Sequence, residues 1–152
     1  MPNWCTNVLS VTGESKKIEG FKTHWVPRTF NSLLPMPEDV ETQKEESQDC
    51  YLRHFTLQSP SEIDSGAPDW YYWRVANWGT KWDVKEGDVI CLEDGKEHIV
   101  FEFDTAWSPV IPLVKEISVK FPLLVFLLEY HEPGMDFAGY VRFVGGEAVD
   151  EE

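Results

Sequence analysis

The sequence predicts a single α+β domain in which an antiparallel sheet follows the split βαββαβ order, with a helical insertion after the first helix and an extra C-terminal strand. The first observation is the order of periodicities along the chain. Strand-like alternation and helix-like stripes succeed one another as strand, helix, insertion with helix, strand, strand, helix, strand, strand. The second observation is size, because 152 residues with 42% hydrophobic content can bury one core without disulfides or metals.

A change of period separates the first strand from the first helix. Residues 5–12 place polar Ser10 between Leu9 and Val11, which is typical of a half-buried strand. Residues 15–25 instead space their large apolar side chains as a helix does, and a proline two residues later ends the helix. The inward face of this helix consists of Ile18, Phe21 and Trp25.

Residues 27–80 are predicted to be an insertion. Its first part is interrupted by prolines and holds a cluster of like charges, so we expect residues 38–66 to be more mobile than the sheet. Residues 41–52 have the composition of a short polar helix, and apolar residues near the start of the insertion are expected to anchor it to the core. The acidic cluster consists of Glu38, Asp39, Glu41, Glu45, Glu46 and Asp49.

An aromatic helix closes the insertion. Pro68 and Asp69 suit a first helical turn, and Gly79 suits the position just after a helix. Aromatic side chains occupy two faces of residues 70–78, so this helix must be covered by another part of the molecule. We expect it to lie on the second face of the sheet.

The remaining elements follow from turn residues and apolar runs. Residues 87–93 and 98–105 flank Asp94-Gly95, a dipeptide typical of tight hairpin turns. A helix is predicted over residues 109–120, with Ser108 as its cap and Pro109 in its first turn. Residues 123–130 are apolar at nearly every position, which predicts a central strand covered on both faces. A last strand over residues 137–144 precedes an acidic tail, residues 145–152.

Without the insertion and the last strand, this order is that of the ferredoxin-like fold. In this fold, the helices 15–25 and 109–120 pack on the same face of the sheet.

The composition limits the kinds of partner. The chain carries 27 acidic and 13 basic residues and a net charge of −14, which repels phosphate backbones and attracts basic proteins. We therefore expect no direct binding to nucleic acid. No apolar run is long enough to cross a bilayer and no secretory signal is visible, so we expect a cytoplasmic protein without a membrane partner.

No pattern of catalytic, cofactor-binding or metal-binding residues stands out. The three cysteines (Cys5, Cys50 and Cys91) and the four histidines (His24, His54, His98 and His131) have no metal-ligand spacing. No nucleophile elbow or phosphate-binding loop is present. We expect no metal and no cofactor, and a non-enzymatic protein. A paired-carboxylate site remains an alternative, drawn from Asp83, Glu102, Asp104 and Glu129.

The strongest functional signal is a group of tryptophans and asparagines at the ends of predicted elements. Asn77-Trp78 repeats Asn3-Trp4, and Trp107 follows the second hairpin strand. Flat apolar rings beside directional polar groups suit a ligand or a partner side chain. The same residues could instead tie the insertion to the sheet and cap turns. The candidate binding residues, called the Trp/Asn patch, are Asn3, Trp4, Asn77, Trp78, Lys81, Trp82, Asp83 and Trp107.

Four blocks of this sequence resemble the YubB-like family of small phage and plasmid proteins. They are residues 1–7 (MPNWCTN), 77–83 (NWGTKWD), 105–109 (TAWSP) and 132–134 (EPG), which span nearly the whole chain. The resemblance implies a ferredoxin-like domain and an origin in a mobile genetic element. It implies no activity and no catalytic residues.

These observations lead to one functional hypothesis and two alternatives. We expect a non-enzymatic protein-binding module of a phage or plasmid that acts on a host protein in the bacterial cytoplasm. One alternative is an acidic inhibitor that mimics nucleic acid and blocks a host defence or nucleic-acid-processing complex. The other is a small-molecule binder or enzyme that uses the Trp/Asn patch.

Overall fold

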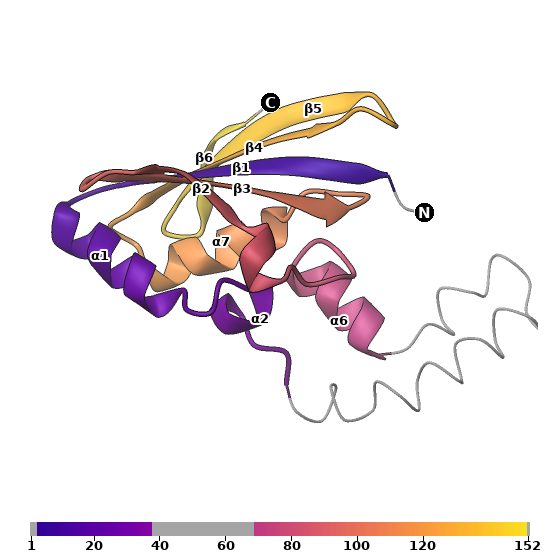
Figure 1. Cartoon of the computed structure of the whole chain (residues 1–152), viewed down its shortest axis with the longest axis horizontal. Helices are drawn as coiled ribbons and strands as arrows, with labels where there is room; N and C mark the ends of the chain where they lie inside the picture. The colour runs from indigo at the N-terminus through magenta and orange to yellow at the C-terminus, as the bar shows by residue number, and fades with distance from the viewer. Residues whose placement is uncertain (1–2, 38–68, 152) are drawn as a thin grey trace, which may run out of the picture.

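The protein, as a computed structural model that describes residues 3–37 and 69–151, forms a twisted antiparallel sheet with helices against one face (Figure 1). The strands are β1 (Trp4–Thr12), β2 (Ile90–Asp94), β3 (His98–Ala106), β4 (Val125–Glu132), β5 (Phe137–Val144) and β6 (Glu147–Glu151). The helices are α1 (Ser15–His24), α2 (Phe30–Leu33), α6 (Asp69–Asn77) and α7 (Ile111–Lys120), with a 3-10 turn η2 (Glu86–Asp88) before β2.

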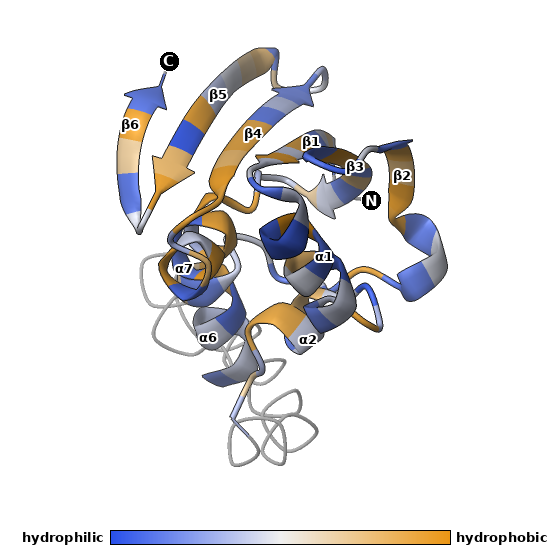
Figure 2. Ribbon diagram, turned by 90° about the vertical axis from the view of Figure 1, so that its left-hand side faces the viewer, coloured by the Kyte–Doolittle hydropathy of each residue, from blue (hydrophilic) through white to orange (hydrophobic). Residues whose placement is uncertain are grey.

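The strand order confirms the ferredoxin-like prediction. The six-stranded sheet has the order β2-β3-β1-β4-β5-β6, so β1 lies in the middle and pairs antiparallel with β3 and β4. The first four strands of this order, together with α1 and α7, form the βαββαβ unit, and β5 and β6 extend the sheet beyond β4. Both helices of the unit lie on the same side of the sheet (Figures 1 and 2).

The core lies between the sheet and this helical layer. Side chains alternate along β1, so that Leu9 and Val11 are buried towards the helices while their neighbours face the other way. Phe21 of α1 contacts the rings of Phe101 and Phe126, with centroids 6.5 and 5.5 Å apart. From α7, the buried side chains are Leu113, Val114, Ile117 and Ser118.

Both described ends of the insertion pack into the same layer as α1 and α7. Phe30 and Leu33 of α2 are buried, as the apolar start of the insertion suggests. The aromatic helix α6 also lies on the helical side, which corrects the expectation that it covers the second face (Figure 1). The cause is Trp78 at its end, which is fully buried in the core with its ring 5.9 Å from that of Phe30.

The second face of the sheet, called here the open face, is not covered by any helix of the described residues (Figure 2). In β4, buried Phe126 and Leu128 point to the helices, whereas Leu127 is half-buried and Glu129 is exposed. The prediction that this strand is covered on both faces is therefore wrong. Its apolar run begins in a turn, because residues 123 and 124 precede the strand, and it gives way to polar side chains on the open face.

Two turns and the start of one helix differ from the sequence prediction. The predicted acidic tail forms β6, because Gly145 and Gly146 both have positive φ (58° and 88°) and make a two-residue hairpin turn after β5. The Asp94-Gly95 hairpin instead has a three-residue connection, since β3 starts only at His98. Helix α7 starts at Ile111 after the N-cap Val110, with proline in its first turn.

Some expectations lie outside the described residues. They are the mobility of residues 38–66, the polar helix over residues 41–52, and the positions of Cys50 and His54. Within the described ranges, no helix combines the length and the apolar character that crossing a membrane requires.

Candidate functional site

The sequence blocks that contain the Trp/Asn patch meet at one end of the sheet. Trp4 at the start of β1 pairs with Ala106 at the end of β3, and the backbone N–H of Trp107 donates to the carbonyl of Asn3 at 2.8 Å. The hydroxyl of Thr80 donates to the carbonyl of Ala106 at 3.0 Å. The loop after α6 is thereby hydrogen-bonded to the end of β3, which pairs with the start of β1.

Glycine at position 79 makes this close approach possible. Gly79 has a φ of 92°, and a Cβ atom there would come within 2.7 Å of the carbonyl oxygen of Pro109. The backbone carbonyl of Gly79 accepts a hydrogen bond from the Ser108 hydroxyl at 2.5 Å. Ser108 thus joins the two loops rather than capping α7, which corrects the sequence prediction for this residue.

Three tryptophans of the patch lie on the surface at this end. The exposed fractions are 47% for Trp4, 40% for Trp82 and 45% for Trp107. The rings of Trp4 and Trp82 are in contact, with centroids 6.2 Å apart and planes inclined by 43°. The Lys81 ammonium lies 4.5 Å from the ring centroid of Trp82, a cation–π distance. Trp4, Lys81, Trp82 and Trp107 are called the tryptophan rim below.

Three other residues of the Trp/Asn patch have structural roles. Trp78 is buried, and its ring N–H donates to the carbonyl of Leu34 at 3.0 Å. The Asp83 carboxylate accepts the backbone N–H groups of Phe30 (2.6 Å) and Asn31 (3.2 Å), and so stabilises the N-terminus of α2. The Asn77 amide donates to the carbonyl of Trp73, one turn earlier in α6, at 2.9 Å.

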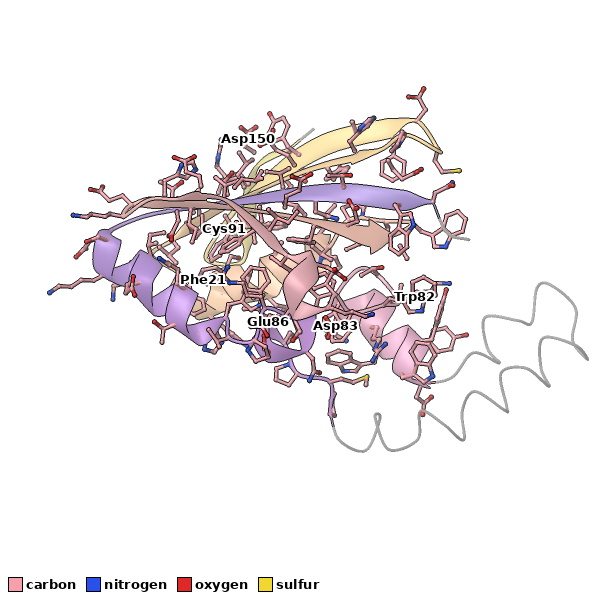
Figure 3. The ribbon with its side chains drawn as sticks, viewed as in Figure 1. Phe21, Trp82, Asp83, Glu86, Cys91 and Asp150 are labelled. Atoms are coloured by element: carbon pink, nitrogen blue, oxygen red, sulfur yellow. The ribbon has the colours of Figure 1, made fainter. Side chains whose placement is uncertain are left out.

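Figure 3 shows the different placements of Trp82 and Asp83, although they are neighbours in the chain. Asn3 is half-buried and contributes its backbone carbonyl to the contact with Trp107. The patch therefore divides into an exposed part, the tryptophan rim, and a part that holds the rim in place.

Asn7 supports this end of the sheet, and the sequence analysis did not single it out. Its buried amide nitrogen donates to the Thr105 hydroxyl at 2.8 Å and to the Cys5 carbonyl at 3.1 Å. Its amide oxygen accepts the backbone N–H of Val110, the N-cap of α7, at 3.3 Å. The available signal was a lone amide in the inward-facing phase of an otherwise apolar strand.

A buried carboxylate and a buried thiol lie near Asn7. Glu132 is fully buried, and one of its carboxylate oxygens accepts the backbone N–H of Gly134 at 2.8 Å in the turn after β4. Burial, together with the negative charges of Glu132 and Asp104, raises the pKa of the Cys5 thiol to about 11. Cys5 is therefore a protonated core thiol at neutral pH.

A hollow of about 400 Å³ lies beside Trp4. Its lining includes the side chains of Ile90, Asp88 and Asp104. Asp104 accepts a hydrogen bond from the Thr6 hydroxyl at 3.0 Å. The hollow combines an aromatic wall with carboxylates, so it suits a basic or planar group of a partner.

The remaining candidates for chemistry do not converge in the part of the chain described. No group of three or more His, Cys, Asp or Glu side chains there is arranged to hold a metal ion. Of the four acids considered for a carboxylate pair, Asp83 binds the α2 N-terminus, and Glu102 and Glu129 flank Val8 on opposite neighbouring strands.

Comparisons with known proteins support the fold and its family. The model of a family described as "Ferredoxin-like domain in Api92-like protein" matches residues 77–152. The crystal structure of protein Api92 from Yersinia pseudotuberculosis is similar, with a TM-score of 0.61 and 13% sequence identity over 100% of this chain and 98% of that chain. At this identity the similarity shows the fold alone. A comparison with curated protein sequences finds no match.

Proposed function

This chain belongs to the Api92-like family with a ferredoxin-like domain, and we propose that it is a non-enzymatic protein-binding module whose contact surface is the tryptophan rim. In this proposal the chain comes from a phage or plasmid and acts on a host protein in the bacterial cytoplasm. The origin is supported by the four blocks that resemble the YubB-like family, and residues of all four lie at the rim end of the sheet.

The observation that carries the proposal is the exposure of three tryptophans at one end of the molecule. Large exposed rings are unfavourable in water, whereas tryptophan is enriched among the residues that dominate the binding energy of protein interfaces. A tryptophan also offers a large contact area with few rotatable bonds, so little side-chain entropy is lost on binding.

The rim is also held in a fixed position before any partner arrives. The hydrogen bonds of Thr80 and Ser108 fix the loop that carries Lys81 and Trp82, and the Trp4 ring packs against Trp82. A contact surface that is already ordered avoids part of the entropy loss of association. The buried half of the Trp/Asn patch therefore supports the proposed function indirectly, by fixing the exposed half.

The test compares exposed residues at the two ends of the sheet. Trp82→Ala and Trp107→Ala remove rim surface, and Leu123→Ala is the matched control, because Leu123 is 68% exposed in the α7–β4 turn at the opposite end. Each variant is used as bait in host lysate, and the affinity of any captured protein is then measured with purified components. Trp82→Ala is expected to weaken binding by roughly 2 kcal/mol, about 30-fold, as interface tryptophans do.

Chemical denaturation checks that the variants are folded. Each of the three variants should have a free energy of unfolding close to that of the unmodified chain. A host protein that binds all three variants with equal affinity would show that the rim is not the contact surface. Trp78→Ala does not serve here, because Trp78 is part of the core.

A further inference from the structure

Two hollows lie on the open face of the sheet, and neither has a residue of the tryptophan rim in its lining. One hollow of about 390 Å³ has Thr6, Val8, Glu129 and Tyr140 in its lining. A second, of about 240 Å³, includes Leu127, Glu129, Tyr140 and Asp150. Because Glu129 and Tyr140 belong to both linings, the two hollows are neighbours on β1, β4, β5 and β6, and together they are called the groove below.

The floor of the groove includes apolar side chains with carboxylates among them. Val8 and Leu127 are half-buried on the open face, and Ala138, which lines the same hollow as Val8, is exposed. Val8 pairs with Glu102 on one side and with Glu129 on the other, so carboxylates stand on both sides of Val8 in one row across three strands.

The basic side chains in the lining are His131 and Arg142, and Arg142 is already engaged with an acid. Arg142 lies 2.9 Å from the Asp150 carboxylate, and the Tyr140 hydroxyl donates to the same carboxylate at 3.2 Å. Asp150 projects from the side of the sheet opposite to Phe21 and the helices (Figure 3). With histidine counted as neutral, the lining carries two carboxylates, Glu129 and Asp150, against Arg142, and Glu102 adds a third carboxylate beside Val8.

We propose that the open face is the docking site for a basic amphipathic α-helix of a partner protein. An apolar stripe of such a helix covers the floor, and its lysines and arginines face Glu102 and Glu129. The inference rests on the proposed function only in its premise that the chain binds another protein, since it uses a different surface and names the chemistry of the partner.

The dimensions and the architecture both favour a helix. The groove and Glu102 lie on the five neighbouring strands β3-β1-β4-β5-β6, which span roughly 19 Å at about 4.8 Å spacing, so a helix of about 18 residues, roughly 27 Å long, is long enough to cover them. The other face of this sheet is covered by helices α1 and α7 (Figure 2). When helices cover only one face of a sheet, the other face remains available to a second layer of helices.

The experiment uses synthetic peptides of about 18 residues as probes. The first peptide is an amphipathic helix with leucines on one face and lysines and arginines on the other. The second carries glutamates in place of the basic residues, and the third has the composition of the first in a scrambled order. The full-length chain is titrated with each peptide and the affinity is measured by calorimetry.

Charge reversal on the two sides of the sheet locates the site. Glu129→Lys changes the groove, and Glu116→Lys makes the same change on α7, where Glu116 is exposed on the helical side. The basic amphipathic peptide should bind the unmodified chain and the Glu116→Lys variant alike. It should bind Glu129→Lys at least about tenfold more weakly, because a like charge then faces its lysines. Ala138→Arg, a second change in the groove lining, should act in the same direction, and circular dichroism checks that each variant is folded.

Several outcomes would overturn the inference. Equal binding of the acidic or scrambled peptide would show that neither charge nor helical amphipathicity matters. Equal losses of peptide affinity in Glu129→Lys and Glu116→Lys would show that the peptide responds to the net charge of the chain and not to the groove. A dimer in sedimentation that Ala138→Arg dissociates would show that a second copy occupies the face. Trp82→Ala should leave peptide binding unchanged, so a failure of the rim proposal remains distinguishable from a failure here.

Discussion

At the scale of single residues, Asn7 is the polar side chain on which the architecture of the rim end depends most. It is buried and bonded to β1, β3 and the start of α7 at once. Asn7→Ala should lower the free energy of unfolding by about 2–4 kcal/mol, because it leaves the Thr105 hydroxyl and the Val110 N–H without this partner inside the protein. Urea denaturation measures the change.

The control for this prediction is the same substitution in a less connected asparagine. Asn77→Ala removes a single bond to the carbonyl of Trp73 from a half-buried side chain, and its cost should not exceed about 1 kcal/mol. Equal effects of the two substitutions would mean that the Asn7 network adds nothing beyond one hydrogen bond.

Sequence reasoning located the candidate site only in part. The repeated Asn-Trp pairs indicated which loops come together at one end of the sheet, and the structure brings Trp4 and Trp82 into contact. The same pattern did not separate exposed from buried members. Trp78 lies one residue past α6 and turns into the core, and the Asp83 carboxylate is used by α2, a helix distant in sequence. Such long-range partners have no signature in local spacing.

At the scale of elements, two glycines should respond to alanine in opposite directions. Gly146→Ala should destabilise the fold by about 1–2 kcal/mol, since the residue has a φ of 88° in the β5–β6 turn. Gly20→Ala lies within α1 with no atom near the added methyl group, and should stabilise by about 0.5–1 kcal/mol. Thermal and urea unfolding of the two variants check both signs. A loss of stability in Gly20→Ala would show that α1 does not tolerate even a solvent-facing methyl group.

The order of the elements was predictable because each period extends over a whole strand or helix. The exceptions arose where a local signal competed with tertiary structure. Asp94-Gly95 suggested the tight turn, but the two-residue turn with positive φ is at Gly145-Gly146, so the last residues form a strand instead of a tail. The apolar run before β5 indicated burial without showing that only one side of the strand faces the helices.

At the scale of the whole molecule, charge decides which large partners can approach. With 27 acidic and 13 basic residues, the chain should not bind duplex DNA or RNA at about 0.15 M salt. A gel shift with labelled duplexes measures this, and the Glu129→Lys variant serves as a control in which the net charge remains strongly negative, because replacing one glutamate by lysine raises −14 by only two units. A shifted band for the unmodified chain would contradict the prediction and would indicate a local basic surface stronger than the overall field.

The two edges of the sheet bear on how copies of the chain behave when they are concentrated. Edge strands invite another molecule to add a strand, which is how fibrils grow. Here β2 is interrupted by a register shift between Cys91 and Glu93, and β6 carries the carboxylates of Glu147, Asp150 and Glu151. Two copies meeting at β6 would bring these charges against each other, so edge-to-edge assembly is opposed near neutral pH. The acidic strand β6 therefore opposes edge-to-edge polymerisation of the chain.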